Sequence, residues 1–197
     1  MNNNIKKIIL ALLLSCNMTG CVVIAGAAIG VVTAGAIIYD HRTPDVSEQD
    51  KWITKQIKYQ LSKNEAIAHQ TYIVVSTFDR VVLLAGQSPT KELKQQAMEI
   101  AQNIPGIKKI YNQIAVEIPT HSTSTAAEDN WIATKIRTKL ISRRDLNSGS
   151  IQIVVVNSNV YLMGTVSQYQ AHEVTKVAQH VSGVKRIVKL FQYREDL

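Results

Sequence analysis

One segment of this 197-residue chain occurs twice, and this duplication restricts the possible folds more than any other feature. Residues 50–61, DKWITKQIKYQL, return as residues 129–140, DNWIATKIRTKL. Two further pairs of matching segments follow in the same order and at nearly the same spacing: 83–86 with 161–164, and 104–110 with 181–187. The period exceeds that of the common solenoid repeats, which is about 20–50 residues, so we predict two tandem copies of one small domain.

Residues 1–20 have the layout of a secretory signal peptide. Two lysines are followed by an unbroken apolar run over residues 8–14, and small residues then precede Cys21. The junction before Cys21 resembles a bacterial lipobox, in which the cysteine becomes the diacylated first residue of the mature protein. Cys16 is a second candidate for that role. We expect a signal peptide over residues 1–20 and lipidation, palmitate included, at Cys21.

Residues 21–47 are expected to form an Ala/Gly-rich tether behind the lipidated cysteine. The apolar run 22–38 is at the short edge of the length that a membrane-spanning helix needs. It is either a tether that lies along the membrane or a second hydrophobic insertion, and both readings stay open. Val22 follows Cys21 where an Asp would retain a lipoprotein in the inner membrane. By analogy with Gram-negative sorting, we expect the periplasmic face of the outer membrane.

Charge and cysteine usage exclude several classes of protein. Both cysteines precede residue 22, so the repeats can hold neither a disulfide framework nor a CxxC metal site. The net charge of +7 and a pI near 9.4 are typical of nucleic-acid binders. An anchor outside the cytoplasm would separate the protein from nucleic acid, so we expect no such partner.

Both copies predict the same order of elements, α-β-β-α-β. The first copy predicts a helix over 50–62, strands over 72–76 and 81–85, a helix capped by Ser88 with Pro89 at its first position, and a strand over 108–118. The second predicts a helix over 129–143, strands over 150–157 and 160–166, a helix over 168–181 and a strand over 184–193. The expected fold class is α+β, with a three-stranded mixed sheet and two helices on one face of each domain. The domains would span 48–118 and 128–194 around a linker over 119–127, and their small size favours packing of one on the other.

This order of elements resembles that of the BON domain. The segments LLAGQSP at 83–89, WIATKIR at 131–137 and VSGVKR at 181–186 carry the resemblance, together with the glycine before each last strand. The complete layout is similar to that of outer-membrane lipoproteins with two BON domains. The family usually has glycine in the first hairpin turn, where this chain has Asp79-Arg80 and, in the second copy, Asn157-Ser158-Asn159. Asp and Asn tolerate left-handed backbone, so we expect altered turns rather than a lost fold.

The repeats contain no recognisable catalytic motif, neither G-x-S-x-G, nor HExxH, nor a phosphate-binding glycine loop. His172, Glu173 and His180 share a predicted helix but do not converge on a metal, and we expect them to be solvated or half-buried. Glu92 and Glu99, two turns apart on the other second helix, are expected to be surface carboxylates. We therefore expect no enzyme activity, no cofactor and no metal site.

One face of the helix over 129–143 carries the composition of a membrane contact. At 100° per residue, Trp131, Lys135, Thr138 and Ser142 lie opposite the apolar core stripe, with Ile141 on the flank. Trp favours the headgroup boundary and Lys favours phosphate. We predict a phospholipid-binding site made of these five residues with Arg137 and Lys139 alongside, and Arg143 and Arg144 add positive charge at the helix exit.

The first copy serves as a control for this site. Trp52 occupies the same angle as Trp131, but Gln56 stands where the second copy has Lys135. Residues 48–118 carry nine basic and seven acidic residues, and residues 128–197 carry ten and six, so the net charges are +2 and +4. The second copy is therefore the better candidate for an anionic membrane. The resemblance implies the same, because the second BON domain of such lipoproteins is associated with anionic phospholipid and envelope integrity.

Two alternatives remain. Each Trp can instead have a structural role, folded over the edge of its domain or placed in the contact between the repeats. The protein can also be a scaffold that docks an envelope assembly partner through the open face or an edge of a sheet. The sequence leaves the oligomeric state open.

Overall fold

The computed structural model describes residues 43–194, which lie within a compact unit spanning residues 38–197. The predicted signal peptide, the lipidation site at Cys21 with its alternative Cys16, and the apolar run 22–38 lie outside the described residues. The three hydrophobic clusters of the structure all fall within residues 53–191. A chain that begins at residue 38 therefore keeps the complete described core, and we expect it to fold on its own.

Each copy has the predicted α-β-β-α-β order, with one short additional helix in each. The first domain consists of α2 (Pro44–Lys63), α3 (Glu65–Gln70), β1 (Tyr72–Phe78), β2 (Val81–Ser88), α4 (Lys91–Gln102) and β3 (Lys109–Val116). The second consists of α5 (Thr123–Ile141), the 3-10 helix η1 (Ser148–Ser150), β4 (Ile151–Val156), β5 (Asn159–Val166), α6 (Gln168–Gln179) and β6 (Arg186–Tyr193).

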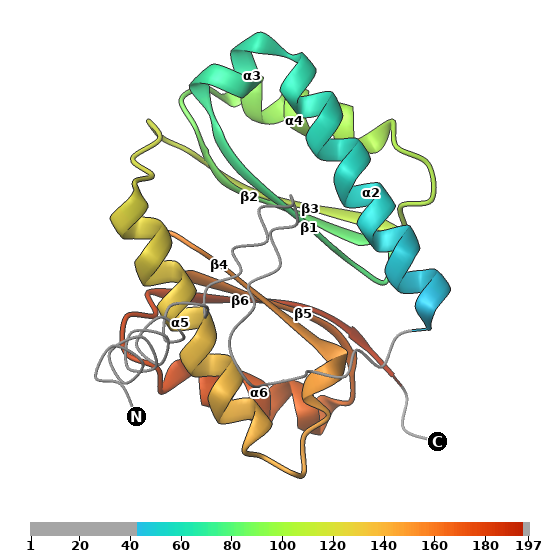
Figure 1. Cartoon of the computed structure of the whole chain (residues 1–197), viewed down its shortest axis with the longest axis vertical. Coiled ribbons are helices and arrows are strands. Elements are labelled where there is room, and N and C mark those ends of the chain that lie inside the picture. The colour runs from blue at the N-terminus through green and yellow to red at the C-terminus, as the bar shows by residue number, and fades with distance from the viewer. Residues whose placement is uncertain (1–42, 195–197) are drawn as a thin grey trace, which may run out of the picture. The chain divides into compact units, whose positions relative to one another are not determined.

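Each domain forms one three-stranded mixed sheet. The strand orders are β1-β2-β3 and β4-β5-β6, with the first two strands antiparallel and the third parallel to the middle one. Figure 1 shows α2, α3 and α4 on one side of the first sheet and α5 and α6 on one side of the second. The predicted fold class, two tandem α+β domains with helices on one face of a mixed sheet, is confirmed.

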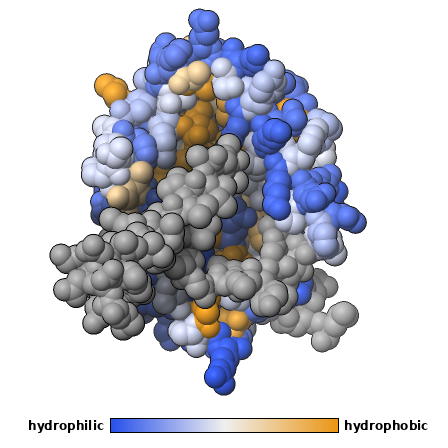
Figure 2. Space-filling model, in the orientation of Figure 1, coloured by the Kyte–Doolittle hydropathy of each residue, from blue (hydrophilic) through white to orange (hydrophobic). Residues whose placement is uncertain are grey.

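The repeated apolar positions form the core between helices and sheet. Ile132, Ile136 and Leu140 of α5 are buried against the second sheet, and their counterparts in α2 are buried against the first. Burying each such side chain stabilises the fold by about 1.5–3 kcal/mol. Figure 2 shows that the outer surface of the first domain's helices, at the top of the view, is mainly hydrophilic. These helices therefore bury one side and leave the other for solvent or ligands.

Both long helices begin earlier than predicted, at Pro44 and Thr123 rather than at residues 50 and 129. Pro44 occupies the first turn, where its missing N–H costs nothing, and the Ser122 hydroxyl caps α5 by accepting from the Thr125 N–H at 3.2 Å. Ser- and Thr-rich sequence was predicted as linker, but here it supplies the cap. In α4 the cap is Thr90, which accepts from Leu93 N–H, and the predicted role of Ser88 is wrong.

Two buried aspartates hold the unusual hairpin turns. Asp79 and Arg80 have φ of 49° and 61°, and Asn157 and Ser158 have φ of 51° and 63°, so both turns are left-handed without glycine. The Asp129 carboxylate accepts the backbone N–H groups of Asn157 and Ser158, each at 2.7 Å. Asp50 accepts those of the first turn at 2.7 and 2.8 Å. The expectation of altered turns within an intact fold is confirmed, and these bonds supply the reason.

The strand-ending glycines are required by close approach of the neighbouring strand. Gly86 has φ of 138°, and a Cβ there would collide with the carbonyl oxygen of Tyr72. Gly164, in the same place in the second domain, would collide with that of Ser150. A side chain at either position would push the hairpin apart.

The faces of the two sheets that carry no helices pack on each other. A third cluster is made of residues from both domains: Phe78, Val81, Leu83, Ala85, Val156, Tyr161, Met163 and Leu190. At its edge, Asp79 accepts hydrogen bonds from Thr165 at 3.3 Å and Gln192 at 3.4 Å, and Gln152 donates to Ser76. Every residue of β2 is buried, because both of its faces are covered. The expected packing between the repeats is confirmed.

Candidate functional site

The outward face of α5 carries an exposed tryptophan with a lysine against it. Trp131 is 55% exposed, and the Lys135 ammonium lies 3.0 Å from the centre of its ring. Such a cation–π contact is worth about 0.5–1 kcal/mol at an exposed site. It holds a large apolar ring and a positive charge together in one exposed place.

This pair lines a shallow groove of about 400 Å³ between α5 and the loop that follows α6. Four predicted site residues contribute to it: Trp131, Lys135, Thr138 and Lys139. The Lys135 ammonium donates to Ser182 Oγ at 3.1 Å, and the Lys139 ammonium donates to the His180 carbonyl at 3.4 Å. Both partners are neutral, and no carboxylate of the described residues pairs with either lysine. The groove therefore keeps two positive charges that are not neutralised.

The other three predicted site residues lie outside the groove. Arg137 is half-buried on the flank of the helix, where burial lowers the pKa of its guanidinium below the ordinary value. Ile141 is 42% exposed in the last turn, and Ser142 ends the helix by donating to the Lys139 carbonyl at 2.8 Å. An exposed Ile beside the groove can add apolar contact, whereas Ser142 has a structural partner.

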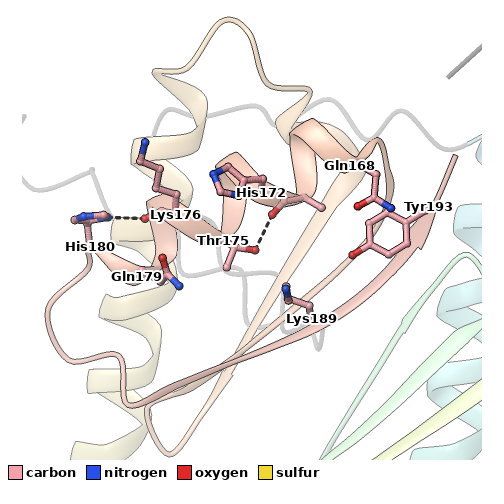
Figure 3. Close-up of a pocket in the computed structure, with 9 residues that line it drawn as sticks. Gln168, His172, Thr175, Lys176, Gln179, His180, Lys189 and Tyr193 are labelled. Carbon is pink, nitrogen blue, oxygen red and sulfur yellow. Dashed lines mark hydrogen bonds between the residues drawn. The ribbon is translucent and has the colours of Figure 1, made fainter. Parts of the chain in front are cut away.

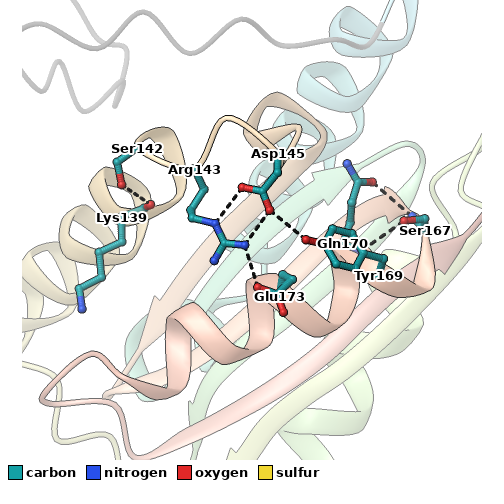
Figure 4. Close-up of polar contacts among 8 residues, drawn as sticks. All are labelled: Lys139, Ser142, Arg143, Asp145, Ser167, Tyr169, Gln170 and Glu173. Carbon is teal, nitrogen blue, oxygen red and sulfur yellow. Dashed lines mark hydrogen bonds and ion pairs between the residues drawn. The ribbon is translucent and has the colours of Figure 1, made fainter.

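The helix exit adds less positive charge than the sequence suggested, because Arg143 is compensated, whereas Arg144 is exposed and takes part in none of the ion pairs among residues 43–194. The Arg143 guanidinium donates to both oxygens of Asp145 at 2.8 and 2.6 Å, and to Glu173 at 2.8 Å, as Figure 4 shows. Tyr169 also donates to Asp145 at 3.0 Å. The hydrogen bonds from Arg143 hold the pKa of Asp145 and of Glu173 below their ordinary values. Because two carboxylates compensate Arg143, its predicted contribution to the membrane face is wrong.

The first domain presents a related but weaker face. Trp52 is 45% exposed and Tyr59 is 53% exposed. One side of α2 therefore carries two exposed aromatic side chains. Lys63 lies over the Tyr59 ring at 5.0 Å, near the end of the helix, and Gln56 stands where Lys135 would be. Neither Trp belongs to the cluster between the sheets, so the alternative that places them in that contact is wrong.

Sequence reasoning missed part of the site. Ser182 and the backbone of His180 come from the far end of the domain, long after the two lysines that they bind. The repeated VSGVKR segment marks this loop, but nothing in it indicates that the loop meets α5. That juxtaposition depends on tertiary packing.

The remaining titratable candidates are exposed or paired. Glu99 accepts from Gln95 at 3.1 Å on the surface of α4, and hydrogen bonding from its own backbone and from Thr90 lowers the pKa of Glu92. Within residues 43–194, no group of three or more His, Cys, Asp and Glu side chains is placed to hold a metal ion. The helices of this part of the chain are all too short or too polar to cross a bilayer.

Comparison with known proteins supports the assignment of the repeats. The BON domain matches residues 49–118 and 128–195. The chain is 27% identical over 191 residues to the outer membrane lipoprotein DolP of Haemophilus influenzae, an alignment that covers 96% of each protein. It is 29% identical over 154 residues to a 21 kDa hemolysin of Actinobacillus pleuropneumoniae, with 78% of this chain and 79% of the relative covered. It is 27% identical over 140 residues to the osmotically-inducible protein Y of Escherichia coli, with 70% and 69% covered.

The two BON matches account for most of the chain and coincide with the two domains described above. Internal duplication, the αββαβ order and the strand-ending glycines all agree with those matches. The chain belongs to the BON domain family.

Proposed function

We propose that this protein is a lipid-anchored outer-membrane protein that faces the periplasm and binds anionic phospholipid through the α5 groove of its second BON domain. It contributes in this way to envelope integrity, without enzyme activity. The likeness to an outer membrane lipoprotein along 96% of both chains supports the location. Lipidation at Cys21 supplies the anchor. Replacing Cys21 with Ala releases the protein to the soluble periplasmic fraction, and Cys16→Ala does not.

The observation that carries the lipid-binding proposal is the Trp131–Lys135 pair. The ring is exposed, the ammonium lies on it, and the uncompensated Lys139 is one turn away on the same groove. An exposed tryptophan on a helix that lies on a membrane inserts at the boundary between the headgroups and the acyl chains. Each basic residue near an anionic surface contributes about 1 kcal/mol, so the two lysines account for about 2 kcal/mol of attraction.

The second domain is the better lipid site because the first lacks this combination. Gln56 in place of Lys135 leaves Trp52 without a cation from that position, and the first domain carries the lower net charge. The alternative function, a scaffold for an envelope assembly partner, requires docking through an open sheet face or through a sheet edge. The helix-free faces of the two sheets contact each other through the cluster between the domains, which argues against docking through those faces.

Co-sedimentation of residues 38–197 with phosphatidylglycerol vesicles tests the proposal, with phosphatidylcholine vesicles as the neutral reference. We expect Trp131→Glu to abolish binding and Lys135→Gln, which restores the residue of the first copy, to weaken it about fivefold. Trp52→Glu is the matched control and should bind like the unchanged chain. Binding should also decline as salt is raised, because screening weakens the attraction. Equal losses in Trp131→Glu and Trp52→Glu, or no binding to phosphatidylglycerol at all, would contradict the proposal.

A further inference from the structure

Helix α6 and the edge strand β6 enclose a second groove in the second domain, of about 520 Å³. It shares only His180 with the α5 groove. In Figure 3, Lys189 and the Tyr193 hydroxyl reach from β6 toward the helix, which supplies His172 and Thr175 on the other side. The lipid-binding proposal makes no use of this surface.

The described residues that line this groove, the α6–β6 groove, are rich in hydrogen-bond donors and include no acid. Lys176 and Lys189 carry positive charge, and neither pairs with a carboxylate of residues 43–194. Glu173 lies on the same helix and does not line the groove; it is bound to Arg143, and the nearby charge of Lys176 also contributes to lowering its pKa. Lys176 projects outward in Figure 3, and its flexible four-carbon stem lets the ammonium swing over the opening. The groove therefore attracts an anion.

The first domain shows that the fold itself does not require these residues. Aligning the caps Thr90 and Ser167 places the two helix–strand units in register. The counterparts then differ at eight of the nine lining positions. Lys176 and Lys189 correspond to Glu99 and Asn112, and His172 and Tyr193 correspond to Gln95 and Val116. The first domain has its own lysines, Lys91 and Lys94, where the second has Gln168 and Ala171.

The first domain joins its helix and strand at the equivalent place. The Asn112 amide donates to the Lys94 carbonyl at 3.2 Å and so joins β3 to α4. In the second domain these two positions hold Lys189 and the small Ala171, and both line the open groove. One copy thus bonds its strand to its helix, and the other leaves a basic opening in the same place.

We propose that the α6–β6 groove binds a phosphate monoester. Near neutral pH such a group carries close to two negative charges and three acceptor oxygens. The two ammonium groups match its charge, and the imidazole of His172 and the hydroxyl of Tyr193 supply further hydrogen-bonding groups. The volume lies within the range of small-ligand sites, about 300–1,000 Å³, and leaves room for a body such as glycerol or a sugar.

A titration of ¹⁵N-labelled residues 38–197 with inorganic phosphate and with glycerol 3-phosphate, followed by NMR at constant ionic strength, tests this site. We expect saturable shifts of amides in α6 and β6, centred on Thr175 and Lys189. The double variant Lys176→Glu/Lys189→Asn carries the residues of the first domain and should weaken binding at least about tenfold. Both side chains are exposed, so the second domain should stay folded, as undisturbed amide signals of its strands β4 and β5 would show.

A matched control separates a site from a general effect of charge. Lys51→Glu/Lys55→Asn removes the same charge from the exposed face of α2 and should leave phosphate binding unchanged. The proposal is overturned by equal weakening in both double variants. It is also overturned by shifts that do not saturate, or by shifts that chloride at the same ionic strength reproduces.

The phosphate can belong to a soluble ester or to a lipid headgroup, and vesicles distinguish these sources. The Trp131→Glu variant, which lacks the proposed lipid site, is mixed with phosphatidic acid vesicles. Pelleting that glycerol 3-phosphate competes away identifies a headgroup ligand, and saturable binding of glycerol 3-phosphate without pelleting identifies a soluble ester. Because phosphate binding is measured in this variant, failure of the groove and failure of the α5 site give different results.

Discussion

Replacing Asp129 with Ala is expected to destabilise the second domain far more than the removal of an exposed surface carboxylate does. Asp129 is 5% exposed, and its two oxygens accept two backbone N–H groups of the turn, each at 2.7 Å. Hydrogen bonds to a charged group contribute about 1.5–3 kcal/mol each, and part of this offsets the desolvation of the buried carboxylate. We expect a loss of about 2–4 kcal/mol in the free energy of unfolding. For a unit of this size that is a fall in Tm of roughly 5–15 °C.

Urea denaturation of residues 38–197, followed by circular dichroism, measures the loss. The control is Glu128→Ala, which removes the same charge from the neighbouring, exposed position and should change stability by less than about 0.5 kcal/mol. Asp129→Asn should fall between the two, because an amide offers one acceptor oxygen where the carboxylate offers two. If Asp129→Ala and Glu128→Ala unfold at the same urea concentration, the aspartate does not hold the turn and the reasoning is refuted.

Two further outcomes follow from the same structure. Arg80→Gly should stabilise the first domain by about 1 kcal/mol, because Arg80 has φ of 61°, where glycine avoids the steric cost of a side chain. The urea midpoint should therefore rise, and an unchanged or lower midpoint would contradict this prediction. Glu173→Gln should destabilise the protein at neutral pH, because Arg143 lowers the pKa of Glu173 in the folded state. That contribution is fully present above the unfolded pKa of about 4.3 and is lost as pH falls through the folded value, so the two proteins should converge in acid. A gap between their urea midpoints that stays constant with pH would show that the ion pair is not its source.

The sequence was most informative where it repeats. The matched positions of α2 and α5 predicted the helices and their buried sides, because the helical period is a local property that one segment displays by itself. The strands were predicted from short β-branched segments, and the three-stranded sheet from the α-β-β-α-β order of the elements. The helix starts were missed, since capping by Ser122 and the first-turn Pro44 depend on single residues inside polar sequence.

The candidate site was only partly predictable. The helical angle alone brought Trp131 and Lys135 together, and the structure places the ammonium on the ring. The neutralisation of Arg143 involves Glu173 on the next long helix, and no local pattern indicates that pairing. The role of Asp129 was missed for the same reason, although its repetition at the first position of both copies was a visible signal.

The contact between the two sheets bears on the origin of the chain. Equivalent positions of the two copies contribute to it in pairs: Phe78 and Val156, Leu83 and Tyr161, Ala85 and Met163. Two identical subunits that meet through the same patch form an isologous dimer. Joining such subunits in one polypeptide frees the halves to diverge, since each surface then exists once per molecule. Tyr161 and Met163 are larger than their counterparts Leu83 and Ala85, an asymmetric refitting that a fused chain permits and a symmetric homodimer forbids.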